Sequence, residues 1–85
     1  MKVEYYRTIL CPRCLYVSQV LKEIKSQHPD LEIEFIEITT NISRTRAAGI
    51  HSVPSLKIGN ALLTGLFLTQ EKIQRFIGRH LEENR

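Results

Sequence analysis

The chain has 85 residues, of which 42% are apolar, and this size and composition predict one globular domain over residues 1–85. Its net charge of +3 comes from Lys and Arg residues scattered along the sequence, which argues against a nucleic-acid partner, because such a partner needs basic residues gathered on one face. No apolar run approaches the roughly 18 residues of a membrane span, and no signal-peptide block follows Met1, so we expect a cytoplasmic protein without a membrane partner.

The predicted elements begin with a strand from Lys2 to Ile9, in which apolar and polar residues alternate. Alternation places successive side chains on opposite faces of a sheet, so one of Tyr5 and Tyr6 is expected to point inward and the other outward. After Cys11 the apolar residues recur at spacings of three and four, which predicts an amphipathic helix that ends near Gln27–His28, before a proline. The apolar face of this helix is expected to comprise Cys14, Leu15, Val17, Val20, Leu21 and Ile24.

The rest of the chain predicts three further strands and two further helices. A strand is expected over Leu31–Ile38, followed by a short helix over Ile42–Ala48 that Gly49 ends. Two strands, Ser55–Ile58 and Ala61–Thr64, flank a Gly-Asn pair that is typical of a tight hairpin. The last helix is expected to begin at the capping residue Thr69, with an apolar stripe of Ile73, Phe76, Ile77 and Leu81.

The predicted order of elements is β-α-β-α-β-β-α. A long helix that joins two strands forms a right-handed crossover, so the first two strands are expected to be parallel. The last two strands form a hairpin that is added to the same sheet. The sequence therefore predicts an α/β fold with a four-stranded mixed sheet flanked by helices.

Both cysteines of the chain, Cys11 and Cys14, fall where the first predicted strand gives way to the first helix. The first N–H groups of a helix have no partner within it and carry partial positive charge, which favours a thiolate at Cys11. Pro12 suits the first helical turn because it lacks an N–H group, and Arg13 adds a permanent positive charge that lowers the pKa further. Cys11, at the exposed helix end, is therefore predicted to be the attacking thiolate, and Cys14, one turn further on, the more buried resolving thiol.

The same two cysteines are compatible with three functions. The favoured one is a thiol–disulfide oxidoreductase, a monomer with no bound metal or cofactor, whose cysteines cycle between dithiol and disulfide to reduce protein disulfides. The second is a metal-binding dimer: two copies would pool Cys11 and Cys14 around zinc, or bridge an iron–sulfur cluster, because one chain lacks the other two ligands. The third is a docking domain in which the disulfide serves as a redox sensor, which would change partner affinity without turning over.

Two motifs give the chain a resemblance to the thioredoxin superfamily, in particular to its small glutaredoxin-like members. They are Cys11-Pro12-Arg13-Cys14 and Ser52-Val53-Pro54, the latter leading into the third strand. The resemblance covers nearly the whole chain and implies a thioredoxin-like fold with protein-disulfide reductase activity. It also implies that Pro54 follows a cis peptide bond and faces the cysteine pair, that Val53 offers backbone hydrogen bonds to an incoming substrate, and that Gly65 binds substrate as the single glycine of the thioredoxin turn.

The resemblance is divided between two branches of the superfamily. The spacing of the motif and the short length are similar to glutaredoxins, but Thr8 stands where these usually carry a basic residue, and the segment around Gly65 has one glycine and no acid. No Trp precedes the motif, and Glu4 and Tyr5 stand near the place of the buried acid of thioredoxins. These departures argue against glutathione as the substrate and favour protein disulfides. The electron donor that recycles the protein is expected to be glutathione or a thioredoxin-reductase-type enzyme, and Leu66–Leu68 are expected to be core residues.

Overall fold

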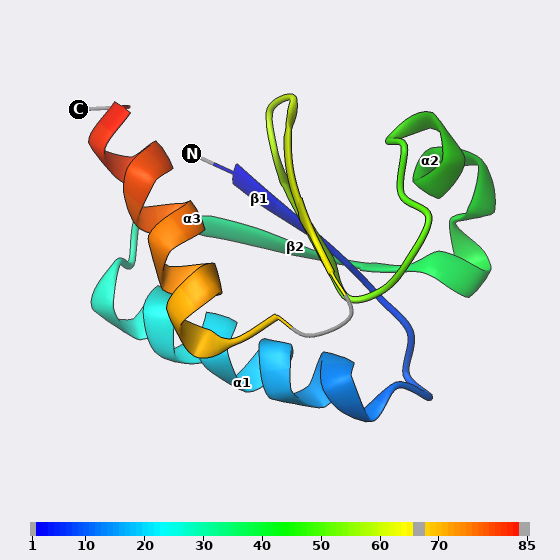
Figure 1. Ribbon diagram of the computed structural model, residues 1–85, viewed down its shortest axis with the longest axis horizontal. Coiled ribbons are helices and arrows are strands. Elements are labelled where there is room, and N and C mark those ends of the chain that lie inside the picture. The colour runs from blue at the N-terminus through cyan, green and yellow to red at the C-terminus, as the bar shows by residue number, and fades with distance from the viewer. Residues whose placement is uncertain (1, 66–67, 84–85) are drawn as a thin grey trace.

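The computed structural model describes residues 2–65 and 68–83. It contains a four-stranded sheet with helices on both faces (Figure 1). The order β-α-β-α-β-β-α is confirmed, with the second strand followed by a short 3-10 turn in place of its last predicted residue. The elements are β1 (Lys2–Arg7), α1 (Pro12–Gln27), β2 (Glu32–Glu37), η1 (Ile38–Thr40), α2 (Ile42–Ala47), β3 (Ser55–Ile58), β4 (Ala61–Thr64) and α3 (Gln70–Glu83).

The strands lie in the order β2-β1-β3-β4, so β1 and β3 are central and β2 and β4 are the edges. As predicted, β1 runs parallel to β2. It also runs antiparallel to β3, which makes the sheet mixed. The hairpin between β3 and β4 turns at Gly59, whose φ of 58° lies in the left-handed region that glycine adopts without strain. None of the helices within the described ranges is long and apolar enough to cross a membrane.

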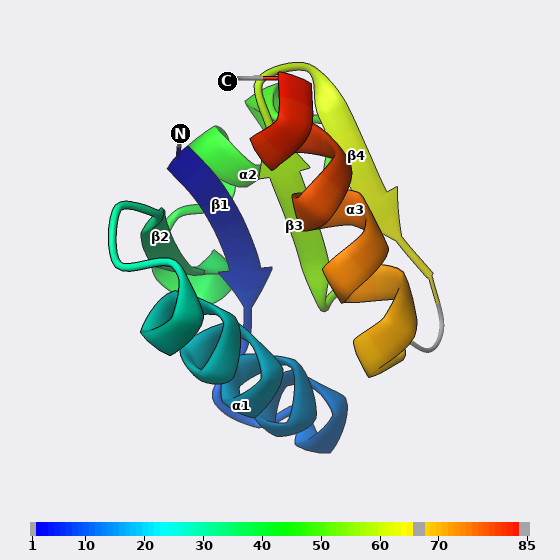
Figure 2. The same cartoon turned by 90° about the vertical axis from the view of Figure 1, so that its left-hand side faces the viewer.

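Helices α1 and α3 cover one face of the sheet and α2 lies over the other (Figures 1 and 2). Under α1 and α3 lies the larger core, which contains Val3 and Leu56 from the central strands, Leu21 from α1, and Ile73 and Ile77 from α3. Their burial confirms the apolar stripes predicted for the two long helices, except at Leu15, which is exposed. The start of α3 is also confirmed: the hydroxyl of Thr69 accepts a hydrogen bond from the backbone N–H of Lys72 at 3.2 Å.

Both tyrosines of β1 are buried, so the prediction that one of them points outward is wrong. Tyr5 lies in the larger core, and Tyr6 lies on the opposite face of the sheet with Ile36 and Ile50. Alternation correctly assigns the two rings to opposite faces. It cannot show that the second face is covered as well, because that cover comes from α2 and the segment after it.

Of the residues expected to be core in the segment 66–68, Leu68 is buried. Leu66 and Phe67 lie outside the described residues.

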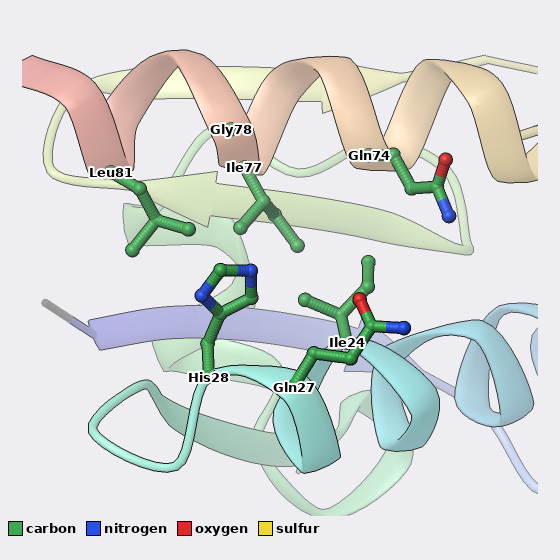
Figure 3. Close-up of a pocket in the computed structure, with 7 residues that line it drawn as sticks. All are labelled: Ile24, Gln27, His28, Gln74, Ile77, Gly78 and Leu81. Atoms are coloured by element: carbon green, nitrogen blue, oxygen red, sulfur yellow. The ribbon is translucent and has the colours of Figure 1, made fainter.

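A hollow of about 250 Å³ separates α1 from α3 at the end of α1 that is remote from the cysteines. Figure 3 shows the ring of His28, just after α1, directed towards Ile77 and Leu81 of α3. Gly78 also lines this hollow and has no side chain to fill it. A Cβ atom built at Gly78 would meet no other atom within 4 Å.

Replacing Gly78 by alanine is therefore expected to stabilise the protein. Glycine inside a helix costs about 0.5–1 kcal/mol relative to alanine, because it loses more conformational freedom on folding. We expect Gly78→Ala to raise the free energy of unfolding by about this amount, measured by chemical denaturation. Gln19→Ala, at an exposed position of α1, serves as the control and should change stability by less than about 0.5 kcal/mol. A lower midpoint for Gly78→Ala would contradict the open space at this position.

Candidate active site

The cysteine motif lies at the start of α1, as predicted. Cys11 is the last residue before the helix and Pro12 is its first residue. Cys11 has an extended backbone, and its C=O group accepts the first hydrogen bond of the helix from the N–H of Cys14 at 3.1 Å. Both thiols are free. This arrangement brings the positive end of the helix dipole against Cys11.

The two thiols have opposite shifts in pKa. Burial raises the pKa of Cys11, but hydrogen bonds from Cys14 and Arg13 outweigh it, so the net pKa of Cys11 is lowered. Burial raises the pKa of Cys14, more than a hydrogen bond from the backbone of Thr8 lowers it. Cys11 is therefore the thiol that ionises first, and Cys14 retains its proton to higher pH.

Cys11 is less exposed than predicted. Its exposed fraction is 9%, against 0% for Cys14, so the predicted order is right but Cys11 does not stand open at the helix end. The reason is the turn before it, in which the N–H of Cys11 donates to the C=O of Thr8 at 3.3 Å. This turn draws Cys11 inward and leaves Ile9 and Leu10 facing solvent.

The sheet brings the three other predicted substrate residues to the same end of the molecule. The peptide bond between Val53 and Pro54 is cis, and Pro54 is buried. Ser55, which follows it, pairs with Tyr6 near the end of β1 that leads to the cysteines. Thr64 pairs with Ser55 as well, so Gly65 also lies at this end. The register of three strands thus gathers segments that are far apart in the sequence, while the roles of Val53, Pro54 and Gly65 in binding stay predictions.

Tyr5 contacts the cysteine motif from below, which the sequence did not predict. Its hydroxyl donates a 2.5 Å hydrogen bond to the C=O of Cys14 and lies 3.1 Å from the hydroxyl of Ser18. Ser18 donates to the same carbonyl at 2.8 Å. Burial raises the pKa of Tyr5 well above its ordinary value, so its hydroxyl stays a neutral donor. A buried tyrosine needs a partner for its hydroxyl. This requirement, together with a serine four residues after Cys14, is the sequence signal that could have indicated a contact between Tyr5 and the motif.

Exposed apolar residues flank the motif in the sequence. Ile9 and Leu10 precede it, and Leu15 and Tyr16 follow it; we call these four residues the apolar collar. Leu15 was expected on the buried face of α1, but it is 57% exposed. Leu15 lies beside the buried stripe at the first turn of α1, where none of the described elements packs over its side chain. Isolated exposed apolar residues are ordinary, whereas a cluster of them marks a contact surface.

A largely apolar hollow of about 320 Å³ adjoins the collar. Pro12, Arg13, Tyr16 and Leu68 line it. The hydroxyl of Tyr16 accepts a hydrogen bond from the N–H of Gln70 at 3.2 Å, which holds the start of α3 against α1. The hollow is therefore bounded by the first turns of α1, directly after Cys11, and by Leu68, which precedes α3.

Loss of the charge at Arg13 is expected to make Cys11 less reactive. In Arg13→Gln the cation is removed while a polar side chain remains, so the pKa of Cys11 should rise and its alkylation by iodoacetamide at pH 7 should become several-fold slower. The measurement is the alkylation rate as a function of pH, made in a Cys14→Ser background so that only one thiol reacts. Lys22→Gln, at an exposed position further along α1, is the control. Identical pH profiles for Arg13→Gln and the control would show that Arg13 does not act on the thiolate.

Within the part of the chain that the structure describes, no group of three His, Cys, Asp or Glu side chains is placed to hold a metal ion. The two cysteines alone provide two ligands, and a structural zinc site needs four. The metal-binding alternative therefore gains no support from these residues.

Comparisons with known proteins place the chain in a family. Residues 1–78 match the family described as Thioredoxin domain. A thioredoxin of Methanocaldococcus jannaschii is 30% identical over 59 residues, which are 68% of this chain and 69% of that protein. Thioredoxin 1 from Thermosipho africanus has a similar structure, with a TM-score of 0.82 and 24% identity over 100% of both chains. Thioredoxin O2 from Arabidopsis thaliana has a TM-score of 0.75 and 20% identity over 92% of this chain and 72% of its own.

The relatives named here are thioredoxins, so they leave the glutaredoxin-like part of the resemblance unconfirmed. The two solved structures agree with the fold of this chain. The chain belongs to the thioredoxin family of thiol–disulfide oxidoreductases.

Proposed function

We propose that this chain reduces disulfide bonds in other proteins through its own Cys11 and Cys14. The observation that carries the proposal is the difference between the two thiols: the pKa of Cys11 is lowered at the helix start, and that of Cys14 is raised by burial. A nucleophile that ionises readily and a resolving thiol that stays protonated until it is needed are the two groups that this reaction requires.

The reaction proceeds in two exchanges. The Cys11 thiolate attacks one sulfur of the target disulfide, forms a mixed disulfide with it, and releases the other sulfur as a thiolate that takes up a proton. Cys14 then loses its proton and attacks the sulfur of Cys11, which releases the second target thiolate and leaves a Cys11–Cys14 disulfide. Two electrons pass from the chain to the target. The oxidised chain is returned to the dithiol by glutathione or by a thioredoxin-reductase-type enzyme.

The apolar collar favours a protein target over glutathione. Ile9 and Leu10, which precede the motif in the sequence, are 69% and 86% exposed, and Leu15, which follows it, is 57% exposed. Burying such side chains against apolar residues beside a target cysteine is favourable, whereas glutathione offers mainly charged groups. The backbone of Val53 is proposed to pair with the extended target segment, and Gly65 to allow its close approach. We further propose that the chain works as a monomer in the cytoplasm.

The test is the reduction of insulin, followed by the turbidity of its free B chain with dithiothreitol as the electron source. We expect the wild-type chain to catalyse this reaction over many turnovers and Cys11→Ser to be inactive. Equal activity of Cys11→Ser would rule out the assigned nucleophile. A wild-type chain that reacts once and then stops would favour the redox-sensor function over catalysis. Replacing dithiothreitol by a glutathione or a thioredoxin-reductase system then identifies the electron donor.

A further inference from the structure

A second groove lies away from the cysteines, between the edge strand β4 and helix α3. It has a volume of about 520 Å³. One wall is formed by Ala61–Leu63 of β4, and the other by side chains of α3. Figure 2 shows α3 running beside β4 along the sheet. The side chains of α3 that line the groove are Lys72, Arg75, Phe76, Arg79 and His80.

The β4 wall offers backbone hydrogen-bonding groups. β4 is the last strand of the sheet, so one row of its N–H and C=O groups has no neighbouring strand within the described residues. Ile58 pairs with Ala61 across a two-residue turn. In such a hairpin the two residues that flank the turn form a hydrogen-bonded pair. Because the bonded pairs alternate with unbonded ones, Leu62 and Thr64 direct their backbone groups away from β3. An edge of this kind is a template for another extended chain.

The α3 wall is positively charged. Lys72, Arg75 and Arg79 recur at spacings of three and four, which places them on one side of the helix. Arg75 is paired with Glu71 at 2.6 Å, but both side chains are exposed, and such a pair is weak. Lys72 and Arg79 form no ion pair with any side chain that the structure describes. Arg44 of α2 is different, because Glu34 and Glu4 already neutralise it at 2.6 and 2.9 Å.

We propose that this groove binds an acidic, extended segment of a partner protein, which adds to the sheet as a strand beside β4. The backbone of that segment would pair with Leu62 and Thr64, and its carboxylates would pair with Lys72 and Arg79. Alternate residues of a strand lie about 7 Å apart, and Lys72 and Arg79 lie about 10 Å apart along α3, a difference that long side chains can bridge. The backbone edge selects a polypeptide, since a nucleic acid offers the charge but not the ladder of N–H and C=O groups. No cysteine takes part, so this binding is independent of the proposed reductase function.

The first test uses a fluorescein-labelled peptide of eight alternating glutamate and valine residues as the probe. Fluorescence anisotropy should show binding that weakens with added salt, and a matched peptide with lysine in place of glutamate should not bind. The double variant Lys72→Glu/Arg79→Glu is expected to weaken binding at least tenfold. Lys22→Glu/Arg46→Glu, which makes the same change in net charge at exposed positions elsewhere, should change it less than twofold. Equal weakening by both double variants would overturn the proposal, because binding would then depend on the net charge of the protein and not on the groove.

The second test reports strand addition itself, in the unmodified protein. Amide hydrogen exchange at Leu62 and Thr64 should slow on addition of the acidic peptide, while exchange at the exposed end of α1 should not. Peptide binding without protection at these two amides would overturn strand addition. Binding of a single-stranded oligonucleotide of equal charge as tightly as the peptide would overturn the choice of partner. Insulin reduction by Lys72→Glu/Arg79→Glu is expected to equal that of the wild type, which separates a failure here from a failure of the reductase proposal.

Discussion

The Cys14→Ser variant is expected to stop after the first exchange and to accumulate a mixed disulfide between Cys11 and its target. Cys11 keeps its position at the start of α1 and its contact with Arg13, so attack on the target is preserved. The resolving step is lost, because serine cannot displace the target sulfur. Effective molarities of well-oriented groups reach about 10⁵–10⁸ M, so external thiols at millimolar concentration should not replace Cys14. The trapped complex is measured by mass spectrometry under non-reducing conditions.

The same substitution at the other cysteine, Cys11→Ser, is the control for the assigned roles. Cys11→Ser leaves Cys14 as the single thiol, and Cys14 is fully buried with a raised pKa. We therefore expect it to form a mixed disulfide at least about 100-fold more slowly than Cys14→Ser, since a buried thiol is rarely ionised and poorly accessible. If Cys11→Ser traps the target and Cys14→Ser does not, the nucleophile and the resolving thiol have been exchanged.

The start of α1 shows why part of the site can be predicted from the sequence. The change from a period of two to a period of 3.6 occurs at Cys11, and Pro12 can occupy only the first turn of a helix without disrupting it. Both signals are local, so they fix the position of Cys11 relative to the helix dipole without any knowledge of the rest of the fold. The same holds for the hairpin at Gly59 and for the cap at Thr69, each of which depends on a few adjacent residues.

The errors arise where a distant segment decides the outcome. Tyr6 is buried because the segment around Ile50 covers its face of the sheet, some 40 residues later in the chain. Leu15 is exposed because, among the described residues, no other element covers it at the first turn of α1. The approach of Pro54 to the cysteine end depends on the antiparallel register between β1 and β3, so it was accessible only through the family resemblance. Tyr5 belongs to the same class, since its contact with Cys14 joins a strand to a helix.

Two substitutions at Tyr5 are expected to separate the contribution of its hydroxyl to stability from that of its ring. Tyr5→Phe removes the hydrogen bond to the C=O of Cys14, but Ser18 still donates to that carbonyl, so the cost should be only about 1 kcal/mol of unfolding free energy. Tyr5→Leu also removes the ring that packs edge-on against Phe35 at 5.3 Å and leaves a cavity, and we expect it to cost about 2–4 kcal/mol. Both costs are measured by chemical denaturation of the reduced protein.

Tyr6→Phe makes the same chemical change at the adjacent residue, on the other face of the sheet. Its hydroxyl donates to the Glu4 carboxylate at 3.3 Å and does not touch the motif, so its loss should cost less than about 0.5 kcal/mol. Burial raises the pKa of Cys14, and the neighbouring hydroxyl of Tyr5 offsets a small part of this rise. Tyr5→Phe should therefore raise the pKa of Cys14 and slow the release of target from the mixed disulfide, whereas Tyr6→Phe should leave this step unchanged. Equal release rates for the two variants would limit Tyr5 to a packing role; a slower rate for Tyr5→Phe alone would make it a positioning residue for the resolving thiol.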